Sequence, residues 1–263
     1  KLDLFDAVIV EGGLNYMDSR YTENNTLSYG MFKDCVTVKE LILPFTLQVI
    51  DQSALEGCTS LISLQIPASV TSFTPSSGCT ALREISISPQ NENFSSVDGV
   101  LYNKAGTELL FYPQGRIASS FTVPETVKTI HEYAFQYCPI ATLHIPNNVE
   151  SLKAYAFYAS GLEEVVLSDA ISTIPYAAFQ QCGKLKKVTL GTSTLLLSEY
   201  CFDGCPLTDL YIAADYPPVR NSLSFHSPDI FKDCTLHVPA GCRALYRSST
   251  SWKDFLRIVE ESF

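Results

Sequence analysis

Long apolar runs are absent from this sequence, and basic residues are few. No stretch approaches the ~20 apolar residues that a membrane-spanning helix needs, so we expect no transmembrane segment in this chain. Lys and Arg together number 18 against 28 Asp and Glu, a formal net charge of −10, and no Lys/Arg run occurs. Because such a surface repels phosphate backbones and anionic lipid, the sequence excludes nucleic acid as a partner.

Reactive groups in catalytic patterns are also missing. The four histidines, His131, His144, His226 and His237, are scattered along the chain. There is no Gly-x-Ser-x-Gly elbow that would carry a catalytic serine, and no phosphate-binding glycine-rich loop. We therefore predict a protein that is not an enzyme and that uses no cofactor.

A short strand phrase, apolar-x-apolar and often followed by Pro, recurs along the chain. Its copies occupy residues 41–43, 64–66, 85–87, 121–123, 143–145, 165–167, 188–190, 210–212 and 236–238. Successive copies begin 23, 21, 36, 22, 22, 23, 22 and 26 residues apart. Seven of these eight intervals lie within the 20–29 residues that are typical of leucine-rich repeats.

Two further phrases recur with the same period. A small or apolar residue, an aromatic or Leu, two variable residues and Cys or Ser occupy residues 31–35, 54–58, 134–138, 156–160, 178–182, 201–205 and 230–234. An apolar-x-x-apolar phrase occupies residues 47–50, 70–73, 127–130, 149–152 and 171–174. One repeat has too little apolar surface to fold alone, whereas stacked repeats bury continuous columns of side chains.

These three phrases predict the fold class, an α/β-type leucine-rich-repeat solenoid that is mainly β. We expect a curved right-handed coil with one parallel sheet of about nine short strands, roughly 4.8 Å apart. Short helical turns or loops should lie opposite the sheet. Hydrophobic residues are 46% of the chain and charged residues 17%, which suits an extensive core.

The long 36-residue interval contains an insertion at residues 91–115. Two strand-prone runs, 100–102 and 109–112, flank a five-residue turn that contains Gly106, which predicts a β-hairpin projecting from the solenoid. The repeats then extend over residues 30–240. Residues 1–29 form a divergent N-terminal cap, with residues 7–10 as a degenerate first strand, and residues 241–263 form a C-terminal cap. In that second cap we expect a short helix at residues 242–246, with Trp252 and Phe255 closing the last rung.

The nine cysteines suit a buried column better than a disulfide framework. Six end a copy of the small-aromatic-x-x-Cys phrase, here called the turn phrase, and Cys79 holds the same column position in the rung that lacks its aromatic. Cys201 stands where other copies have Ala. Cys242 is left over, and the odd count argues against complete pairing; Cys234 and Cys242 are the one pair to test. Zinc ligation by Cys201 and Cys205, or by Cys234 and His237, is the alternative, but the repeat register accounts for these cysteines without a metal.

The phrases together resemble the BspA-like leucine-rich repeats of bacterial surface proteins. Residues 98–113 resemble the family's "DGVLYN…YP" hairpin, and residues 236–255 resemble its closing "L-x-VPAG…Y…W-x-x-F" segment. The resemblance covers about residues 30–258, although the rung at 76–87 lacks its aromatic and Ser160 replaces a column cysteine. It implies an exported protein at the bacterial cell surface or outer membrane, adhering to host matrix or to other cells. The chain begins without Met or a signal peptide, so a signal or lipid anchor would lie outside it.

The outward ladder of the predicted sheet is the main candidate binding surface. Its candidate residues are Glu84, His144, Glu164, Lys187, Tyr211 and His237. His144 and Tyr211 are the expected anchors, because amphipathic rings suit partly buried contacts. The hairpin is the second candidate, since Tyr102, Phe111 and Tyr112 either pack on the rungs or offer a docking patch. For each of these residues the alternative is a solvated surface that binds nothing.

From these features we predict a non-catalytic, adhesin-like monomer that binds a protein or glycan through the sheet face and the hairpin. One alternative is a spacer module without a ligand, and another is a hydrolase with a site on the concave face. A polar cluster on adjacent rungs would favour binding, whereas a pocket with a histidine beside a carboxylate would favour the hydrolase.

Overall fold

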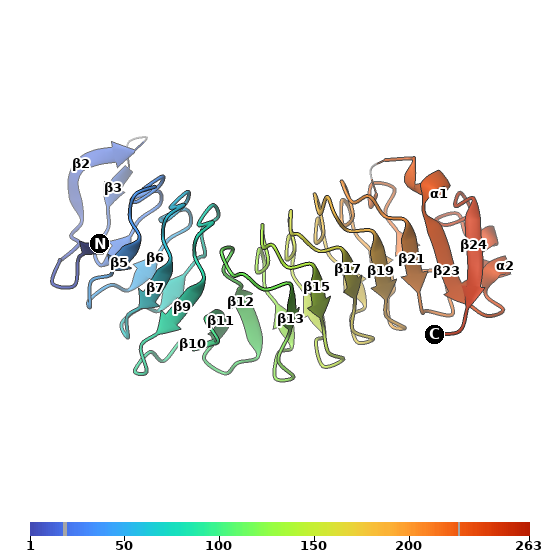
Figure 1. Cartoon of the computed structure of the whole chain (residues 1–263), viewed down its shortest axis with the longest axis horizontal. Helices are drawn as coiled ribbons and strands as arrows, with labels where there is room; N and C mark the ends of the chain where they lie inside the picture. Colours follow the sequence, from blue (N-terminus) through green and yellow to red (C-terminus); the bar gives the residue numbers. More distant parts are fainter. Residues whose placement is uncertain (18–19, 226) are drawn as a thin grey trace. The chain divides into compact units, whose positions relative to one another are not determined.

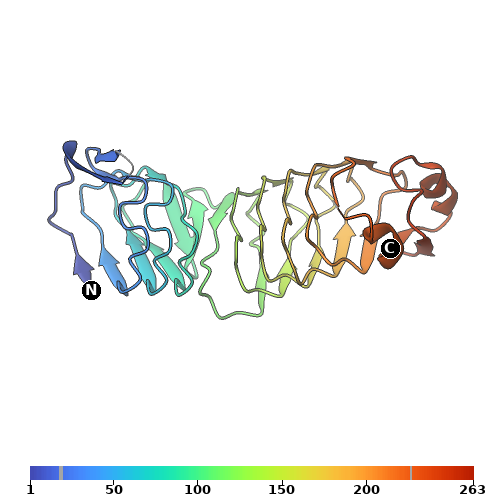
Figure 2. The ribbon, with the colours of Figure 1, turned by 90° about the horizontal axis from the view of Figure 1, so that it is seen from above.

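In the computed structural model, the repeat phrases fold into short strands that pair in parallel (Figure 1). The structure describes residues 1–17, 20–225 and 227–263. The chain divides into two units, Lys1–Ile117 and Ala118–Phe263, here called unit 1 and unit 2. Figure 2 shows the coils of each unit stacked along it.

Unit 1 has one main sheet, a minor ladder and two antiparallel segments. The main sheet contains, in order, β1 (Leu2–Asp3), β5 (Glu40–Ile42), β7 (Ser63–Ile66) and β9 (Glu84–Ile87). The minor ladder contains β4 (Thr26–Leu27), β6 (Val49–Ile50) and β8 (Ser72–Phe73). The antiparallel segments are β2 (Gly12–Met17) with β3 (Arg20–Thr22), and β10 (Phe94–Val97) with β11 (Val100–Asn103) and β12 (Glu108–Phe111).

Unit 2 repeats the same coil with a longer main sheet. This sheet contains, in order, β13 (Ser120–Thr122), β15 (Thr142–His144), β17 (Glu164–Val166), β19 (Lys187–Leu190), β21 (Asp209–Ile212), β23 (Thr235–Pro239) and β24 (Arg257–Glu261). Two-residue strands form two minor ladders: β14 (Thr129–Ile130) pairs with β16 (Ser151–Leu152), and β18 (Thr173–Ile174) pairs with β20 (Leu196–Leu197), which pairs with β22 (Val219–Arg220). The helices are α1 (Ile230–Asp233) and α2 (Arg243–Ser248).

All nine predicted strand phrases form strands, and the solenoid class is confirmed. Two details of the prediction were wrong. The strands divide between two sheets of four and seven strands instead of one sheet. Residues 7–10 form no strand, because β1 takes the place beside β5, and β24 adds an unpredicted strand at the other end. Of the two alternatives predicted opposite the sheet, helical turns or loops, the structure has loops, with turns and two-residue strands. The predicted cap boundaries stay predictions.

A continuous stack of phenylalanine rings fills the core of unit 2. Phe135, Phe157, Phe179 and Phe202 are each at most 1% exposed. Successive ring centroids lie 5.2, 4.7 and 5.3 Å apart, with nearly parallel planes. Each ring comes from the turn phrase of one rung and packs on its copy in the next, as the repeat register predicts.

The turn phrase holds the rungs together through the backbone. Phe135, Phe157 and Phe179 each donate a backbone N–H to the carbonyl of the small residue in the next rung, at 2.8–2.9 Å. Two residues in each turn, four positions apart, adopt positive φ between 52° and 74°. These pairs are Gly30 and Asp34, Ser53 and Gly57, Tyr133 and Tyr137, Tyr155 and Ala159, Ala177 and Gln181, and Tyr200 and Gly204. A left-handed backbone strains every residue except glycine.

All nine cysteines are free thiols, and seven of them, Cys234 and Cys242 included, are buried. The thiols of Cys182 and Cys205 donate hydrogen bonds to the carbonyls of Phe157 and Phe179, both at 3.0 Å. Cys58 and Cys79 make the corresponding bonds in unit 1, at 3.2 Å. A buried thiol in this column therefore fills space and also satisfies a carbonyl of the preceding rung.

The predicted hairpin is present, but it does not project. β11 and β12 pair as expected, and β10 adds a third antiparallel strand through a turn at Asp98 and Gly99, the Asp-Gly pair that tight hairpins favour. Phe94, Leu101 and Phe111 belong to the same buried core as the rungs of unit 1. Asn91, which is fully buried, donates to the carbonyls of Pro67 and Val70 and so ties the insertion to the preceding rung.

The C-terminal segment closes unit 2 much as predicted. Helix α2 covers most of the expected helix, with Cys242 at its N-cap. Trp252 and Phe255 are fully buried, and their rings stack at 5.7 Å. The Trp252 indole N–H donates to the carbonyl of Pro218 at 2.7 Å.

We predict that Phe157→Ala lowers the free energy of unfolding of unit 2 by about 3–5 kcal/mol, because the cavity would lie between two rings that cannot close it. Urea unfolding followed by fluorescence of Trp252, the one tryptophan, would measure this. Tyr216→Ala is the control, because Tyr216 is 77% exposed. An equal, small effect of both changes would mean that the ring stack does not stabilise the core.

Candidate functional site

Two outward rows of side chains line the main sheet of unit 2. Because side chains alternate along a strand, the residues between the buried positions face away from the core. The pairing register aligns one row as Thr122, His144, Val166, Thr189, Tyr211, His237 and Val259. It aligns the other as Ser120, Thr142, Glu164, Lys187, Asp209, Thr235 and Arg257.

The structure brings four of the six predicted sheet-face residues into one cluster on adjacent strands. Lys187 Nζ lies 2.7 Å from Glu164 Oε1 and 5.3 Å from the centre of the Tyr211 ring. Tyr211 stacks on His237 with ring centroids 4.0 Å apart and planes 8° from parallel. We call Glu164, Lys187, Tyr211 and His237 the sheet-face cluster. It joins a cation, two stacked rings and a carboxylate in one contact chain.

His237 stands at the covered end of this cluster. Its Nδ1 lies 3.0 Å from Glu261 Oε1 of β24, and its Nε2 lies 3.0 Å from Asp209 Oδ1. The side chain occupies the outward position that the sequence predicts, yet the residue is only 8% exposed. A histidine held by carboxylates at both ring nitrogens has no nitrogen free to exchange a proton with a substrate.

The charges of the cluster stabilise one another. Burial acts against the charge of Asp209, but hydrogen bonds from His237 and Thr208 and the positive charges of His237 and Lys187 outweigh it and lower the pKa of this carboxyl. The hydrogen bond with Glu164 raises the pKa of Lys187. The Asp209 carboxylate and the Lys187 ammonium group therefore both stay ionised around neutral pH, and each lies beside a group of opposite charge.

The other predicted site residues lie elsewhere. His144 is exposed in the outward row of unit 2 but is not part of the sheet-face cluster, and Glu84 is exposed on β9 of unit 1. Tyr102, Phe111 and Tyr112 are 2%, 3% and 0% exposed. They pack on the rungs, so the docking-patch alternative for the hairpin was wrong. His226 lies outside the described residues.

Sequence reasoning missed two groups of residues. Glu261 and Phe263 complete the sheet-face cluster, since the Phe263 ring lies 6.3 Å from Tyr211, but β24 shows no repeat phrase. A larger group consists of six tyrosines in the turns of unit 2: Tyr133, Tyr137, Tyr155, Tyr158, Tyr176 and Tyr200. One sequence pattern could have identified these tyrosines. A Tyr stands directly before the small residue and the Phe of the turn phrase, as in residues 133–135 and 155–157.

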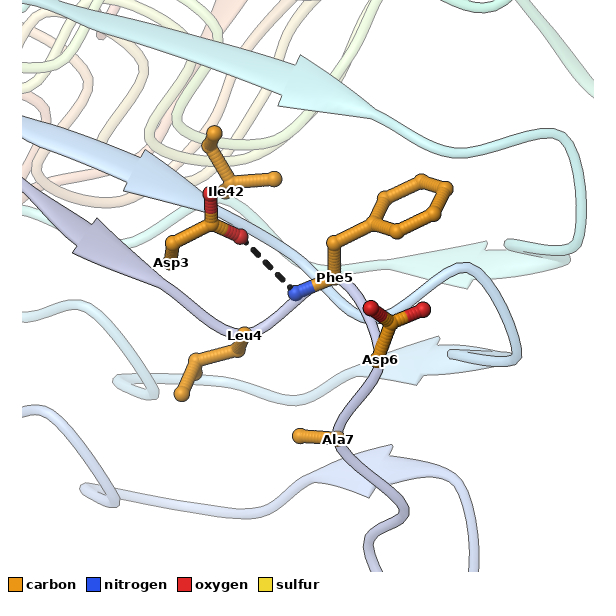
Figure 3. Close-up of a pocket in the computed structure, with 6 residues that line it drawn as sticks. All are labelled: Asp3, Leu4, Phe5, Asp6, Ala7 and Ile42. Atoms are coloured by element: carbon orange, nitrogen blue, oxygen red, sulfur yellow. Dashed lines mark hydrogen bonds between the residues drawn. The ribbon is translucent and has the colours of Figure 1, made fainter.

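Unit 1 carries a hollow of about 500 Å³ beside its first strand (Figure 3). It is lined by Asp3, Leu4, Phe5, Asp6, Ala7 and Ile42. Within it, the Phe5 backbone N–H donates to Asp3 Oδ1 at 3.1 Å, so part of its polar lining is satisfied internally (Figure 3). The lining of a neighbouring, more apolar hollow of about 350 Å³ includes the Phe5 and Phe45 side chains, whose ring centroids are 5.6 Å apart.

Among the described residues, no group of three or more His, Cys, Asp or Glu side chains is arranged to hold a metal ion. In the same residues, no helix has the length and apolar character to cross a bilayer.

We predict that Glu261→Gln loosens β24, because the charged link between its last residue and His237 is lost. Amide hydrogen exchange at residues 257–261 should become faster than in the wild type. Glu163→Gln is the matched control, because Glu163 is exposed beside the cluster. Unchanged exchange in Glu261→Gln would show that backbone pairing alone holds the strand.

We also predict that the stabilisation by Asp209 depends on pH. Its folded-state pKa lies below the ordinary value of about 3.9, so its contribution is fully present above that value. The contribution is lost as the pH falls through the lower folded-state pKa. The difference in unfolding free energy between wild type and Asp209→Asn should therefore shrink in acid; a difference that grows in acid would contradict the assignment.

Comparisons with known proteins identify the repeat. The family model described as "BspA type Leucine rich repeat region" matches residues 19–103 and 108–237, with 6 copies. A search of curated proteins finds no match.

Three solved structures share the fold. A leucine rich cell surface protein from Faecalibacterium prausnitzii has a TM-score of 0.64 at 24% identity, over 90% of this chain and 57% of that one. The pneumococcal vaccine antigen PcpA has 0.60 at 21%, over 90% and 65%. A leucine-rich repeat protein from Eubacterium ventriosum has 0.57 at 22%, over 70% and 64%. This chain thus spans less than two thirds of each of these structures, and the likeness shows the fold.

The family match covers most of the chain and coincides with the rungs of both units. The strands, the phenylalanine stack and the cysteine column all follow the period that this family model describes. The chain therefore belongs to the BspA-type leucine-rich-repeat family.

Proposed function

We propose that this chain is a non-catalytic binding module at a bacterial surface, which holds a protein or glycan on the outward sheet face of unit 2. The partner is a host matrix component or a molecule of another cell surface, and the module acts as a monomer. The observation that carries the proposal is the sheet-face cluster, in which Tyr211 is half-buried and held between Lys187, His237 and Phe263. A ring fixed before binding loses little conformational entropy when a partner contacts it.

Several features support binding over catalysis. The cluster lies on adjacent strands, as expected for a shared contact surface. Although His237 lies beside two carboxylates, both of its ring nitrogens are engaged and its side chain is covered, which does not suit a hydrolase. Two proteins of similar structure, a leucine rich cell surface protein and a pneumococcal vaccine antigen, support exposure on the bacterial exterior.

The charge of the chain restricts the partner. A formal net charge of −10 disfavours nucleic acid and strongly anionic polymers, because both would be repelled. On the sheet face, Lys187 is already paired with Glu164, so no free basic cluster is formed by the residues of the sheet-face cluster. A neutral or basic surface therefore suits the sheet face.

We predict that the purified chain binds saturably to one member of an array of matrix proteins, mucins and glycans, measured at two salt concentrations. Tyr211→Ala should weaken that binding at least about ten-fold, since central aromatic contacts of an interface are worth roughly 2 kcal/mol. His144→Ala should weaken it less, because His144 lies outside the cluster. Tyr216→Ala, a change at an exposed tyrosine off the sheet, is the control.

Two results would contradict the proposal. Silence across the array would favour a spacer module without its own ligand. A saturable hit that Tyr211→Ala and His144→Ala both leave intact would remove the sheet face as the binding surface.

A further inference from the structure

Six of the chain's 14 tyrosines gather in four consecutive turns of unit 2. Tyr133, Tyr155, Tyr176 and Tyr200 form a row with successive ring centroids 5.0, 5.4 and 5.7 Å apart. Tyr158 branches from Tyr155 at 6.0 Å and contacts Tyr137 at 5.7 Å. We call these six residues the tyrosine ladder.

The tyrosine ladder is not needed to fill the core. Phe135, Phe157, Phe179 and Phe202 of the same turns already form the buried stack. In contrast, Tyr133, Tyr137 and Tyr176 are 36%, 48% and 41% exposed. A contiguous exposed aromatic surface on a folded module is typical of an interaction site.

The backbone makes tyrosine an unfavourable choice at most of these positions. Tyr133, Tyr137, Tyr155 and Tyr200 have φ of 57°, 54°, 57° and 56°, where bulky residues are rare. The other equivalent positions hold glycine, at 30, 57 and 204, or a residue that is not aromatic, at 34, 53, 159, 177 and 181. Side chains that strain the backbone where glycine would serve are typical of positions used for function.

The row stays continuous even where the sequence register shifts. In the third turn the left-handed position is Ala177, and the tyrosine stands one residue earlier, at 176. Its ring still contacts Tyr155 on one side and Tyr200 on the other. An unbroken row of four rings is thus kept across four rungs.

The chemistry of the tyrosine ladder is neutral and rich in hydrogen-bonding groups. Burial and a hydrogen bond with Tyr176 raise the pKa of Tyr155 to about 12, and burial raises that of Tyr133, so these phenols stay uncharged. The same turns carry the amides Gln136, Gln180 and Gln181. Their charged residues are three acids and one base, Glu132, Glu199, Asp203 and Lys153, which provides no basic site for sulfate or carboxylate groups.

The spacing of the rings discriminates between classes of ligand. Side chains on one face of an extended peptide repeat every ~6.6–6.8 Å, so a strand would be out of step with the row by roughly 4 Å over three intervals. A polyproline helix repeats every ~9.3 Å, which is further from the observed 5.0–5.7 Å. One sugar unit of an extended polysaccharide has about the length of one rung. The Tyr133 and Tyr155 rings stack on each other, and Tyr176 meets Tyr155 and Tyr200 edge to face, so the row offers a sugar mainly ring edges and phenol hydroxyls. The C–H groups of the sugar pack on those edges, while its hydroxyls bond to phenols and amides.

We propose that the tyrosine ladder binds an extended, neutral polysaccharide, one sugar unit for each rung. This binding uses the turns and not the strands, so it goes beyond the proposed function of the sheet face, and either can fail alone. Tyr155 and Tyr176 lie at the middle of the row and make the central contacts.

The test is a calorimetric titration of the purified chain with three neutral oligosaccharides: cellohexaose, mannohexaose and laminarihexaose. Oligogalacturonate and a heparin oligosaccharide serve as anionic probes, and fibronectin and collagen as protein probes. We expect saturable binding of at least one neutral oligosaccharide and none of the anionic ones. Doubly substituted Tyr155→Ala/Tyr176→Ala should bind that oligosaccharide at least about ten-fold more weakly. The sheet-face change Tyr211→Ala and the control Tyr216→Ala should bind it as the wild type does.

A pair of substitutions at one position separates binding from folding. Tyr133→Ala and Tyr133→Gly both remove the ring, but only glycine relieves the left-handed backbone. We expect equal weakening of oligosaccharide binding in both, with a higher unfolding midpoint for Tyr133→Gly. Binding that follows the midpoint instead of the ring would overturn the proposal.

Three further results would overturn it. These are no saturable binding of any neutral oligosaccharide, preferential binding of an anionic one, and equal binding by wild type and Tyr155→Ala/Tyr176→Ala. If fibronectin or collagen binds and the tyrosine substitutions abolish that binding, the ladder is a protein-binding surface and the polysaccharide assignment is wrong.

Discussion

The hydrogen bond from the turn of one rung to the turn of the next is the interaction on which the rest of the structure depends. The N–H of Phe157 reaches the carbonyl of Ala178, and the N–H of Ala159 reaches that of Gln180, both at 2.8 Å. Two left-handed residues in each turn direct these N–H groups along the unit. With the strands paired on one side and the turns paired on the other, a rung has few backbone groups left without a partner. This is why a repeat of about 22 residues with only three to five strand residues in its main sheet still stacks.

This constraint explains which side chains the columns accept. A turn that tight leaves room for one large flat ring, and stacked phenylalanines fill it at 4.7–5.3 Å. The cysteine that follows meets the carbonyl of the previous phenylalanine, so a small group that donates a hydrogen bond is favoured there. Ser160 takes the same position as Cys182, because a hydroxyl is also small, and it lies within hydrogen-bonding distance of that thiol at 3.3 Å. Burial raises the pKa of Cys138 and Cys201 to about 12, which keeps these column and core thiols protonated and inert.

Periodicity was sufficient to locate all nine repeat strands, because each combines a fixed spacing with a fixed inward pattern. It failed where contacts come from outside the repeat. β1 carries the apolar-x-apolar phrase at residues 2–4, but it begins 39 residues before the next copy, outside the repeat period, so the pattern did not identify it. β24 lacks the phrase, so the covering of His237 by Glu261 had no sign in the sequence. The burial of Tyr102 and Tyr112 depends on how the insertion packs on the rungs, which the hairpin pattern does not determine. The tyrosine ladder was missed for a different reason: its members stand at variable positions of the turn phrase, and Tyr176 is one residue out of column.

The two candidate surfaces of unit 2, the sheet-face cluster and the tyrosine ladder, differ in how many of their groups already have partners within the chain. In the sheet-face cluster each charge has a partner, His237 is covered, and the contacts also fix β24, so part of its chemistry is explained by stability alone. The tyrosine ladder has the opposite balance, because its backbone is strained and its rings remain partly exposed beside a core that is already complete. The left-handed turn serves the stacking of the rungs, but stacking does not require bulky, partly exposed aromatic side chains at these positions, which points to a contact outside the chain. By that physical criterion, the turns of this solenoid have a stronger claim to a ligand than the sheet on which repeat proteins are usually expected to bind.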